Sequence, residues 1–101
     1  MADHYKPNHV LSFEELVSMA KEEPDGFPVW VEYNPRKATF YERGFSGWRI
    51  LMKIHTWSNN DRTLMFNDGE TVDYKNLGVA VRCWLRKPTQ EEMGAVSWET
   101  K

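Results

Sequence analysis

The chain has 101 residues, of which 41% are hydrophobic and 14% aromatic, enough for one domain with one core. Its 13 Lys and Arg against 15 Asp and Glu leave a formal net charge of −2, so no global field attracts nucleic acid or an acidic membrane, and any basic surface must be local. The single cysteine, Cys83, excludes an intramolecular disulfide. No leader-like segment opens the chain, and no apolar run approaches the roughly 20 residues of a membrane span. These features predict a soluble, cytoplasmic protein.

The first predicted element is an amphipathic helix that begins at Phe13. Ser12 is a preferred N-cap residue, and Glu15 stands three positions later, where it completes a capping box. Pro24 predicts that the helix ends soon after Lys21. The apolar stripe has helical spacing and consists of Phe13, Leu16, Val17 and Ala20.

The rest of the chain predicts short strands joined by turns. Period-two alternation and β-branched or aromatic side chains mark the strands, and Asn67-Asp68-Gly69 is a hairpin signal. Residues 74–78 predict a tight helical turn that ends on a glycine. The predicted strands are residues 27–33, 48–57, 62–66, 70–73 and 79–87, with a short further strand around 39–42 inside the long connection 34–47.

The predicted fold class is α+β. One N-terminal helix packs on a strongly bent antiparallel sheet of four to five strands, because the connections are too short for parallel pairing. A small SH3-like barrel is one form that such a sheet can take. The predicted organisation is a flexible N-terminal arm (1–10) that lies on the domain or moves, a single α+β domain (11–88) and a C-terminal tail (89–101) whose helical turn pins Trp98.

Strand alternation divides the side chains of the sheet between two faces. The face predicted to form the core collects Val29, Val31, Ile50, Met52, Ile54, Leu64, Phe66, Val79, Val81, Cys83 and Leu85, with Trp48 in phase with Ile50. The opposite face collects Trp30, Arg49, Lys53, His55, Trp57, Arg82, Trp84 and Arg86. Cations and aromatic rings therefore alternate on one face of the predicted sheet.

We name six residues of this face the predicted Trp/Arg strip: Arg49, Lys53, Trp57, Arg82, Trp84 and Arg86. Such a surface can bind an acidic partner protein, because Trp and Arg are frequent interface hot spots. It can also hold single-stranded nucleic acid by stacking bases on the rings and pairing phosphates with the cations. A third interpretation is internal cation–π packing beneath the helix or the tail.

The sequence contains no arrangement that predicts catalysis. The histidines, His4, His9 and His55, lack the spacing of a metal site, and strand alternation places Cys83 and His55 on opposite faces. The paired glutamates are adjacent in sequence and do not converge on one substrate. We therefore expect a protein that is not an enzyme and that has no catalytic residue, no cofactor, no metal and no small-molecule substrate.

Two blocks of the sequence support a resemblance. The capped helix with its Pro28-Val29-Trp30 strand, and the Tyr74-to-Gly78 turn that leads into an aromatic and basic strand ending at Lys87-Pro88, resemble small uncharacterised proteins of phages, prophages and mobile elements of Gram-positive bacteria. The resemblance covers roughly residues 11–32 and 72–92, and Val81 departs from it where a tryptophan is expected. It implies a compact accessory role and transfers no catalytic residue.

The sequence therefore predicts a non-enzymatic phage- or prophage-type accessory protein. It binds a macromolecular partner, with a host or phage protein favoured, through the predicted Trp/Arg strip. The first alternative is a single-stranded nucleic-acid-binding module that uses the same residues. The second is a structural subunit that assembles through its strand edges. Membrane binding is not expected, and the sequence does not indicate an oligomeric state.

Overall fold

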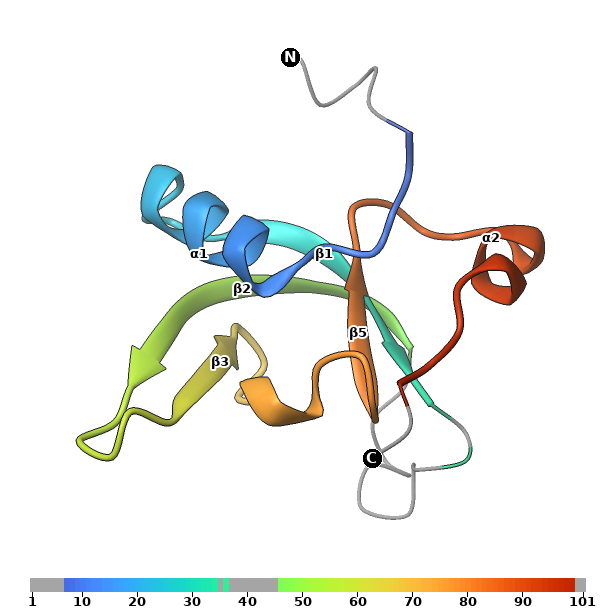
Figure 1. The fold of residues 1–101 in the computed structure, drawn as a ribbon. Coiled ribbons are helices and arrows are strands. Elements are labelled where there is room, and N and C mark those ends of the chain that lie inside the picture. Colours follow the sequence, from blue (N-terminus) through green and yellow to red (C-terminus); the bar gives the residue numbers. More distant parts are fainter. Residues whose placement is uncertain (1–6, 35, 37–45, 100–101) are drawn as a thin grey trace.

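The computed structural model describes residues 7–34, 36 and 46–99. A helix, α1 (Phe13–Glu22), lies against a five-stranded antiparallel sheet, and a short helix, α2 (Gln90–Ala95), lies beyond the last strand (Figure 1). The strands are β1 (Phe27–Tyr33), β2 (Gly47–Thr56), β3 (Arg62–Phe66), β4 (Thr71–Asp73) and β5 (Val81–Trp84), with the 3-10 helix η3 (Tyr74–Asn76) between β4 and β5. The predicted α+β class is confirmed. The strand expected at 39–42 lies outside the described residues.

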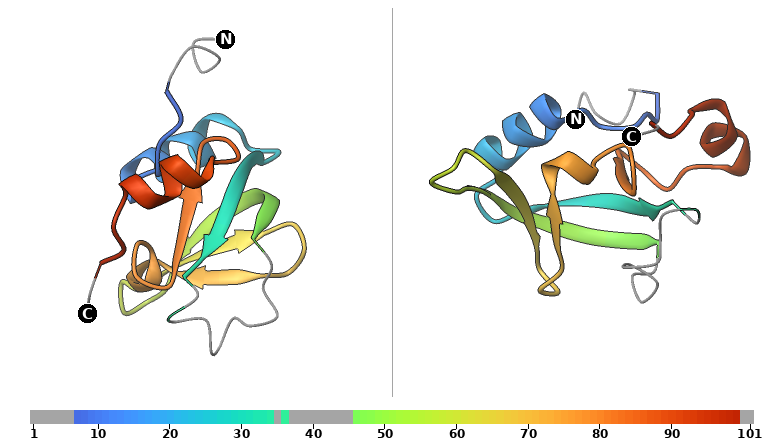
Figure 2. Two further views of the ribbon diagram at one scale, coloured as in Figure 1. Left: turned by 90° about the vertical axis from the view of Figure 1, so that its right-hand side faces the viewer. Right: turned by 60° about the horizontal axis from the view of Figure 1, so that its bottom comes forward.

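The strand order in the sheet is β4-β3-β2-β1-β5, and every neighbouring pair is antiparallel. The sheet is strongly bent, and α1 lies over one of its faces (Figure 2). In the described part of the chain β4 and β5 pair with no common strand and not with each other, so the sheet stays open and does not close into a barrel.

Helix α1 begins at the predicted capping box. The Ser12 hydroxyl accepts a hydrogen bond from the backbone N–H of Glu15 at 3.1 Å, and the Glu15 carboxylate accepts one from the backbone N–H of Ser12 at 2.9 Å. The helix ends at Glu22, two residues before Pro24, because proline cannot supply the next N–H. Leu16 is fully buried and anchors the helix on the sheet.

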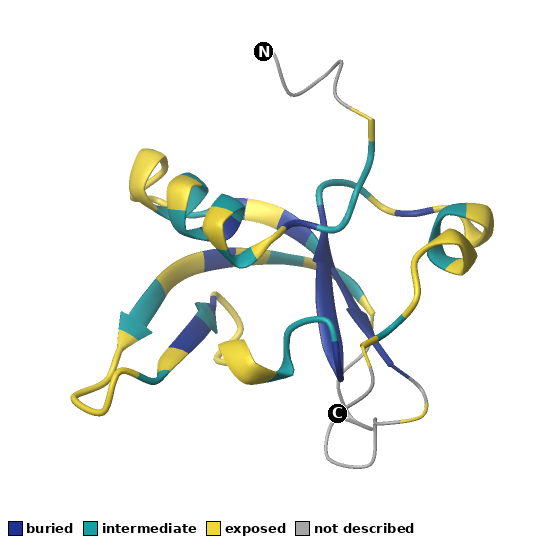
Figure 3. Cartoon of the chain, viewed as in Figure 1, coloured by how far each residue is buried: buried dark blue, intermediate teal, exposed yellow. Residues whose placement is uncertain are grey.

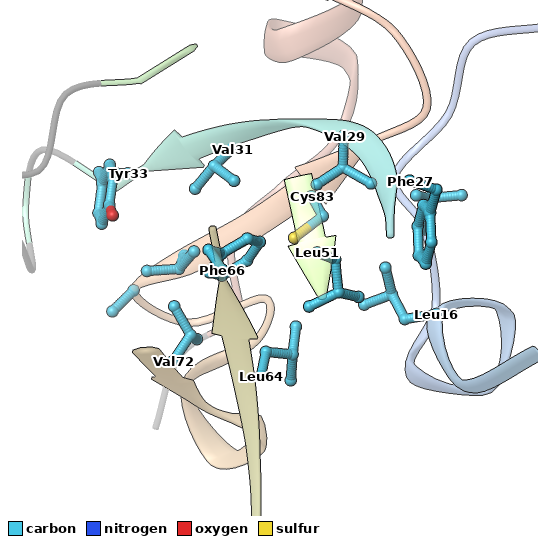
Figure 4. Close-up of a cluster of buried hydrophobic side chains, with 13 residues drawn as sticks. Leu16, Phe27, Val29, Val31, Tyr33, Leu51, Leu64, Phe66, Val72 and Cys83 are labelled. Atoms are coloured by element: carbon cyan, nitrogen blue, oxygen red, sulfur yellow. The ribbon is translucent and has the colours of Figure 1, made fainter. Parts of the chain in front are cut away.

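The core lies between α1 and the sheet, where side chains from all five strands converge (Figure 4). The predictions that Val29, Val31, Leu64, Phe66, Val79, Val81 and Cys83 are buried are confirmed. Ile54 and Leu85 are partly buried at the edge of this core. Leu51 and Phe27, which the core prediction did not include, are also buried there.

The predicted faces of β2 were wrong over its first half. Trp48, Ile50 and Met52 are 53%, 38% and 39% exposed, whereas Leu51 is fully buried. The register explains this, because Leu51 lies opposite Phe27 and therefore shares its core face. A β-bulge between Leu51 and Lys53 then changes the phase, so that Ile54, opposite the buried Leu64, points back toward the core.

The two ends of the domain pack against β5. The backbone N–H of Leu11 donates to the Cys83 carbonyl at 2.8 Å, and that of Leu85 donates to the His9 carbonyl at 3.1 Å. The described part of the N-terminal arm therefore lies along the edge of β5. The last strand begins at Val81 and not at the predicted Val79, because Gly78 adopts φ +85° and the chain turns until Val81. It ends at Trp84, before the predicted Lys87. In the described residues, no helix has the length and apolar character that a membrane crossing requires.

Candidate functional site

The members of the predicted Trp/Arg strip differ in how far they are buried. Arg82 is 2% exposed and Trp84 is 1% exposed, although both lie on the face of the sheet away from α1. We call this face the outer face. Figure 3 shows β5 buried along its length. The distal half of β2, which is the part after Leu51, is exposed or half-buried.

A buried ion pair holds Arg82 in place. Its Nε lies 2.7 Å from Oε1 of Glu32, the cross-strand neighbour on β1, which is 8% exposed. The indole N–H of Trp84 donates to the same Oε1 at 2.7 Å. Two donors thus satisfy the Glu32 carboxylate, which is the condition under which a buried charge is tolerated.

The C-terminal segment, residues 89–99, covers this ion pair. Arg82 donates from Nη1 to the Val96 carbonyl at 2.9 Å and from Nη2 to the Met93 carbonyl at 3.1 Å. The ring of Trp98 stacks on the guanidinium, with 4.1 Å between the ring centroid and Cζ. The predicted helical turn in the tail is α2, which begins with a Thr89–Glu92 capping box. The expectation that the tail pins Trp98 to the domain is therefore met, and its contact is Arg82.

Arg49 lies on the other side of the sheet. It pairs across the strands with Val29, whose side chain is in the core, so it does not share the outer face with Arg82. Its Nε lies 2.9 Å from Oδ2 of Asp68, and its Cζ lies 5.5 Å from the ring centroid of Tyr33. Burial raises the pKa of Asp68, but the backbone N–H of Glu70 and the guanidinium outweigh it and hold that pKa below its usual value.

The remaining members of the strip are dispersed. Trp57 is 49% exposed, and its indole N–H donates to the Thr63 hydroxyl at 2.8 Å. Arg86 is half-buried beside the arm, where its backbone N–H donates to the side-chain oxygen of Asn8 at 2.7 Å. Lys53 is exposed after the bulge of β2. The six residues therefore do not form one exposed surface, and the prediction of a shared face is corrected.

A different group of residues forms the exposed apolar part of the outer face. We call it the outer aromatic patch, and it consists of Pro28, Trp30, Trp48, Ile50 and Met52. Pro28 lies opposite Ile50 and Trp30 lies opposite Trp48 across β1 and β2, so these side chains share one face. The two indole rings make an edge-to-face contact with 5.7 Å between their centroids.

The patch has a hollow and a cationic edge. A shallow hollow of about 340 Å³ is lined by Pro28, Trp48, Arg49, Ile50 and Asn67. Lys87 places its Nζ 5.5 Å from the centroid of the Trp30 ring. The surface therefore offers a partner two aromatic rings, aliphatic side chains and a positive charge at one side.

The structure provides no reactive thiol at this site. Cys83 is fully buried in the core, as strand alternation predicted, and burial raises the pKa of its thiol to about 12. A thiol of that pKa is almost entirely protonated at neutral pH and is a poor nucleophile. Within the described ranges, no three His, Cys, Asp or Glu side chains are grouped where they could hold a metal ion.

Sequence reasoning missed the outer aromatic patch and the role of Glu32. Residues 48–52 contain apolar side chains in both phases, so no local signal separates Leu51 from its neighbours. Glu32 stands 50 positions from Arg82, and only the pairing of β1 with β5 brings them together. The Thr-x-x-Glu pattern at Thr89 was a readable capping-box signal for α2.

Comparisons of the chain with protein families, with curated proteins and with solved structures give no match.

Proposed function

We propose that this chain is a protein-binding module whose contact surface is the outer aromatic patch. The observation that carries the proposal is the exposure of Trp48, Ile50 and Met52, at 53%, 38% and 39%, on one continuous face. Exposed apolar groups that are contiguous on a monomer mark interaction sites more often than single exposed hydrophobics do. Tryptophan is the residue type most enriched among interface hot spots.

The chemistry of the patch favours a protein over nucleic acid. The strongest candidate for a phosphate contact, Arg82, is occupied by Glu32 beneath the C-terminal segment. Beside the patch, Lys87 lies near the Trp30 ring and Arg49 forms an ion pair with Asp68. The chain as a whole carries a net charge of −2. Binding of a single strand would need a row of cations that tracks its phosphates. A partner with an apolar centre and one acidic group facing Lys87 fits the surface better.

The hollow beside Trp48 adds a specific contact. A partner side chain that enters it would lie against Pro28 and Ile50 and would be shielded from water by the indole ring. A partner side chain that loses its contact with water on binding contributes more to affinity than one left at the solvated rim of an interface. The resemblance of the sequence to phage and prophage proteins supports a host or phage protein as the partner and an accessory role for the module.

The test compares three forms of the chain in a capture experiment with lysate of a Gram-positive bacterium. These are the wild type, a Trp48→Ser/Ile50→Ser variant of the patch, and a Trp57→Ser control, which removes an exposed tryptophan outside the patch. We expect one protein to be captured by the wild type and the control but not by the patch variant. With the purified partner, loss of the Trp48 hot spot should weaken affinity by about 30-fold.

Equal capture by all three forms would contradict the proposal. A wild-type chain that binds an oligothymidine, with an affinity that falls steeply with salt, would favour the nucleic-acid alternative. Light scattering on the wild type and on the patch variant identifies self-association. A dimer that the patch variant abolishes would mean that a second copy, and not a host or phage protein, occupies the patch.

A further inference from the structure

A second surface of the domain is a groove between α1 and the distal half of β2. We call it the α1–β2 groove, and its volume is about 620 Å³. It shares no residue with the outer aromatic patch, so the inference drawn from it does not depend on the proposed function. Its lining residues are Phe13, Glu14, Val17, Ser18, Ala20, Lys21, Lys53, Ile54, Thr56 and Arg62.

The groove exists because β2 is longer than its neighbour β1. The pairing of β1 with β2 ends where Phe27 meets Leu51, whereas β2 continues to Thr56 with β3 alone beside it. Gly26, immediately before β1, adopts φ +97°, and an added Cβ there would lie 2.6 Å from Cγ2 of Ile50. The chain therefore turns sharply between α1 and the start of β1, and among the described residues no strand covers this edge of β2 beyond Leu51.

The pairing of β2 with β3 shows which backbone groups lie at this edge. The N–H of Trp57 donates to the Asp61 carbonyl at 2.7 Å, so these two residues form a hydrogen-bonded pair. In an antiparallel ladder such pairs recur at every second residue, which directs the N–H and C=O of His55 and Lys53 toward β3 as well. The N–H and C=O of Ile54 and Thr56 must then point to the open side.

These four backbone groups have no strand beside them in the described part of the chain. Ile54 and Thr56 both line the groove, and the apolar side chains of Val17 and Ala20 form its opposite wall on α1. An uncovered strand edge next to an apolar wall is the arrangement to which extended peptides add a strand, with backbone hydrogen bonds for affinity and side-chain pockets for specificity.

The charge of the groove indicates the kind of peptide. Lys21, Lys53 and Arg62 line it, against the single acidic residue Glu14. The Arg62 guanidinium is held by two rings, with its Cζ 5.3 Å from the Phe13 centroid and 5.9 Å from the Tyr74 centroid. No carboxylate within the described ranges forms an ion pair with any of these three cations. Their charge is available to an acidic ligand.

We infer that the α1–β2 groove binds an extended, acidic segment of a partner protein, which adds to β2 as a strand beside Ile54 and Thr56. Apolar side chains of the segment pack on Val17 and Ala20. Its carboxylates face the cations of the groove.

The test uses two peptides of about eight residues, a length typical of a strand. One alternates glutamate with valine, and the other alternates lysine with valine. Amide signals of the full chain are followed by NMR during titration with each peptide. We expect the glutamate peptide to shift the signals of Ile54, Thr56 and Val17, and the lysine peptide to leave them unchanged. Raising the salt concentration should weaken binding of the glutamate peptide.

Two variants separate strand addition from a general attraction of charges. Thr56→Pro removes an N–H that points away from β3, so the sheet keeps its ladder while the open edge loses a donor. It should weaken binding of the glutamate peptide by about three- to tenfold. Arg62→Glu should weaken it by roughly tenfold. Lys75→Glu is the matched control, because Lys75 is an exposed cation that already pairs with Asp61 outside the groove, and it should leave the affinity unchanged.

Four results would overturn the inference. The first is the absence of shifts at Ile54 and Thr56 at about 1 mM peptide, the weakest affinity of interest for such a contact. The second is binding that Thr56→Pro leaves unchanged. The third is a wild-type dimer that Thr56→Pro dissociates, which would make a second copy of the chain the occupant of this edge. Amide shifts confined to Trp48 and Ile50 would place the peptide on the outer aromatic patch and would equally contradict the groove.

Discussion

The outer face of the sheet has two tryptophan-rich halves, of which one is buried and the other is exposed. Over β5, Trp84 and Arg82 are buried beneath the C-terminal segment. Over β1 and β2, Trp48 is half exposed and has no such cover among the described residues. The two halves adjoin, since Trp30 pairs with Trp48 on one side and with Trp84 on the other. Residue type alone therefore does not distinguish a binding surface from a second core.

The difference arises from what the covering segment provides. Residues 89–99 bring two carbonyls and an indole ring to Arg82, and the N–H of Glu99 donates to the Gly78 carbonyl at 2.8 Å. These contacts satisfy a buried charge and hold the segment from Met93 to Glu99 against the domain. The residues of the outer aromatic patch have no charge that needs a cover of this kind, which leaves their surface available to another molecule.

The largest expected effect on stability comes from a substitution in the covered half of the outer face, over β5. Arg82→Leu leaves the Glu32 carboxylate buried with the Trp84 indole as a remaining donor. Removing one partner of a buried ion pair typically lowers the free energy of unfolding by about 3–5 kcal/mol. Urea unfolding followed by tryptophan fluorescence measures this loss. The double variant Arg82→Leu/Glu32→Leu removes both charges and should recover most of it. A loss below about 1 kcal/mol in the single variant would show that the pair is not buried in solution.

An intermediate effect on stability is expected at Trp98, which holds the C-terminal segment against Arg82. Trp98→Ala removes the ring that stacks on Arg82 at 4.1 Å and should lower the free energy of unfolding by about 1–2 kcal/mol. The amide of Glu99 should then exchange with solvent faster, because its hydrogen bond to Gly78 opens more often. Val96→Ala is the control, since it keeps the carbonyl that Arg82 contacts and changes stability by less than about 0.5 kcal/mol. Equal exchange of Glu99 in both variants would exclude Trp98 as the fastening.

Much of the fold could be predicted because its signals are local. The capping box at Ser12, the apolar stripe of α1 and the alternation of β1 each depend on residues within one element. The burial of Cys83 followed from the alternation of β5, whose core-facing residues are all apolar. Where a single phase of alternation is apolar, the sequence determines the face.

The rest depends on contacts between distant parts of the chain. In β2 both phases contain apolar residues, and the choice between Leu51 and Ile50 is made by the register with β1 and by a bulge that has no sequence mark. The burial of Arg82 requires Glu32 and the C-terminal segment. The α1–β2 groove requires the pairing of β1 with β2 to stop at Leu51, five residues before β2 ends at Thr56. The predicted shared face of the Trp/Arg strip was wrong for this reason, and two of its six residues, Arg82 and Trp84, are buried.

The smallest expected effect sharpens the comparison between the two halves. Trp48→Ser removes an exposed ring and its edge-to-face contact with Trp30, so it should lower the free energy of unfolding by at most about 1 kcal/mol. Trp84→Ser is the matched substitution in the covered half and should lower it by about 3–5 kcal/mol, because it empties a fully packed site and removes a donor to Glu32. Thermal unfolding of both variants gives the two values in one experiment. If Trp48→Ser is as destabilising as Trp84→Ser, the outer aromatic patch is part of the packed structure and cannot serve as the binding surface. If it is tolerated while capture of the partner is lost, the exposed tryptophan is kept for binding and not for folding.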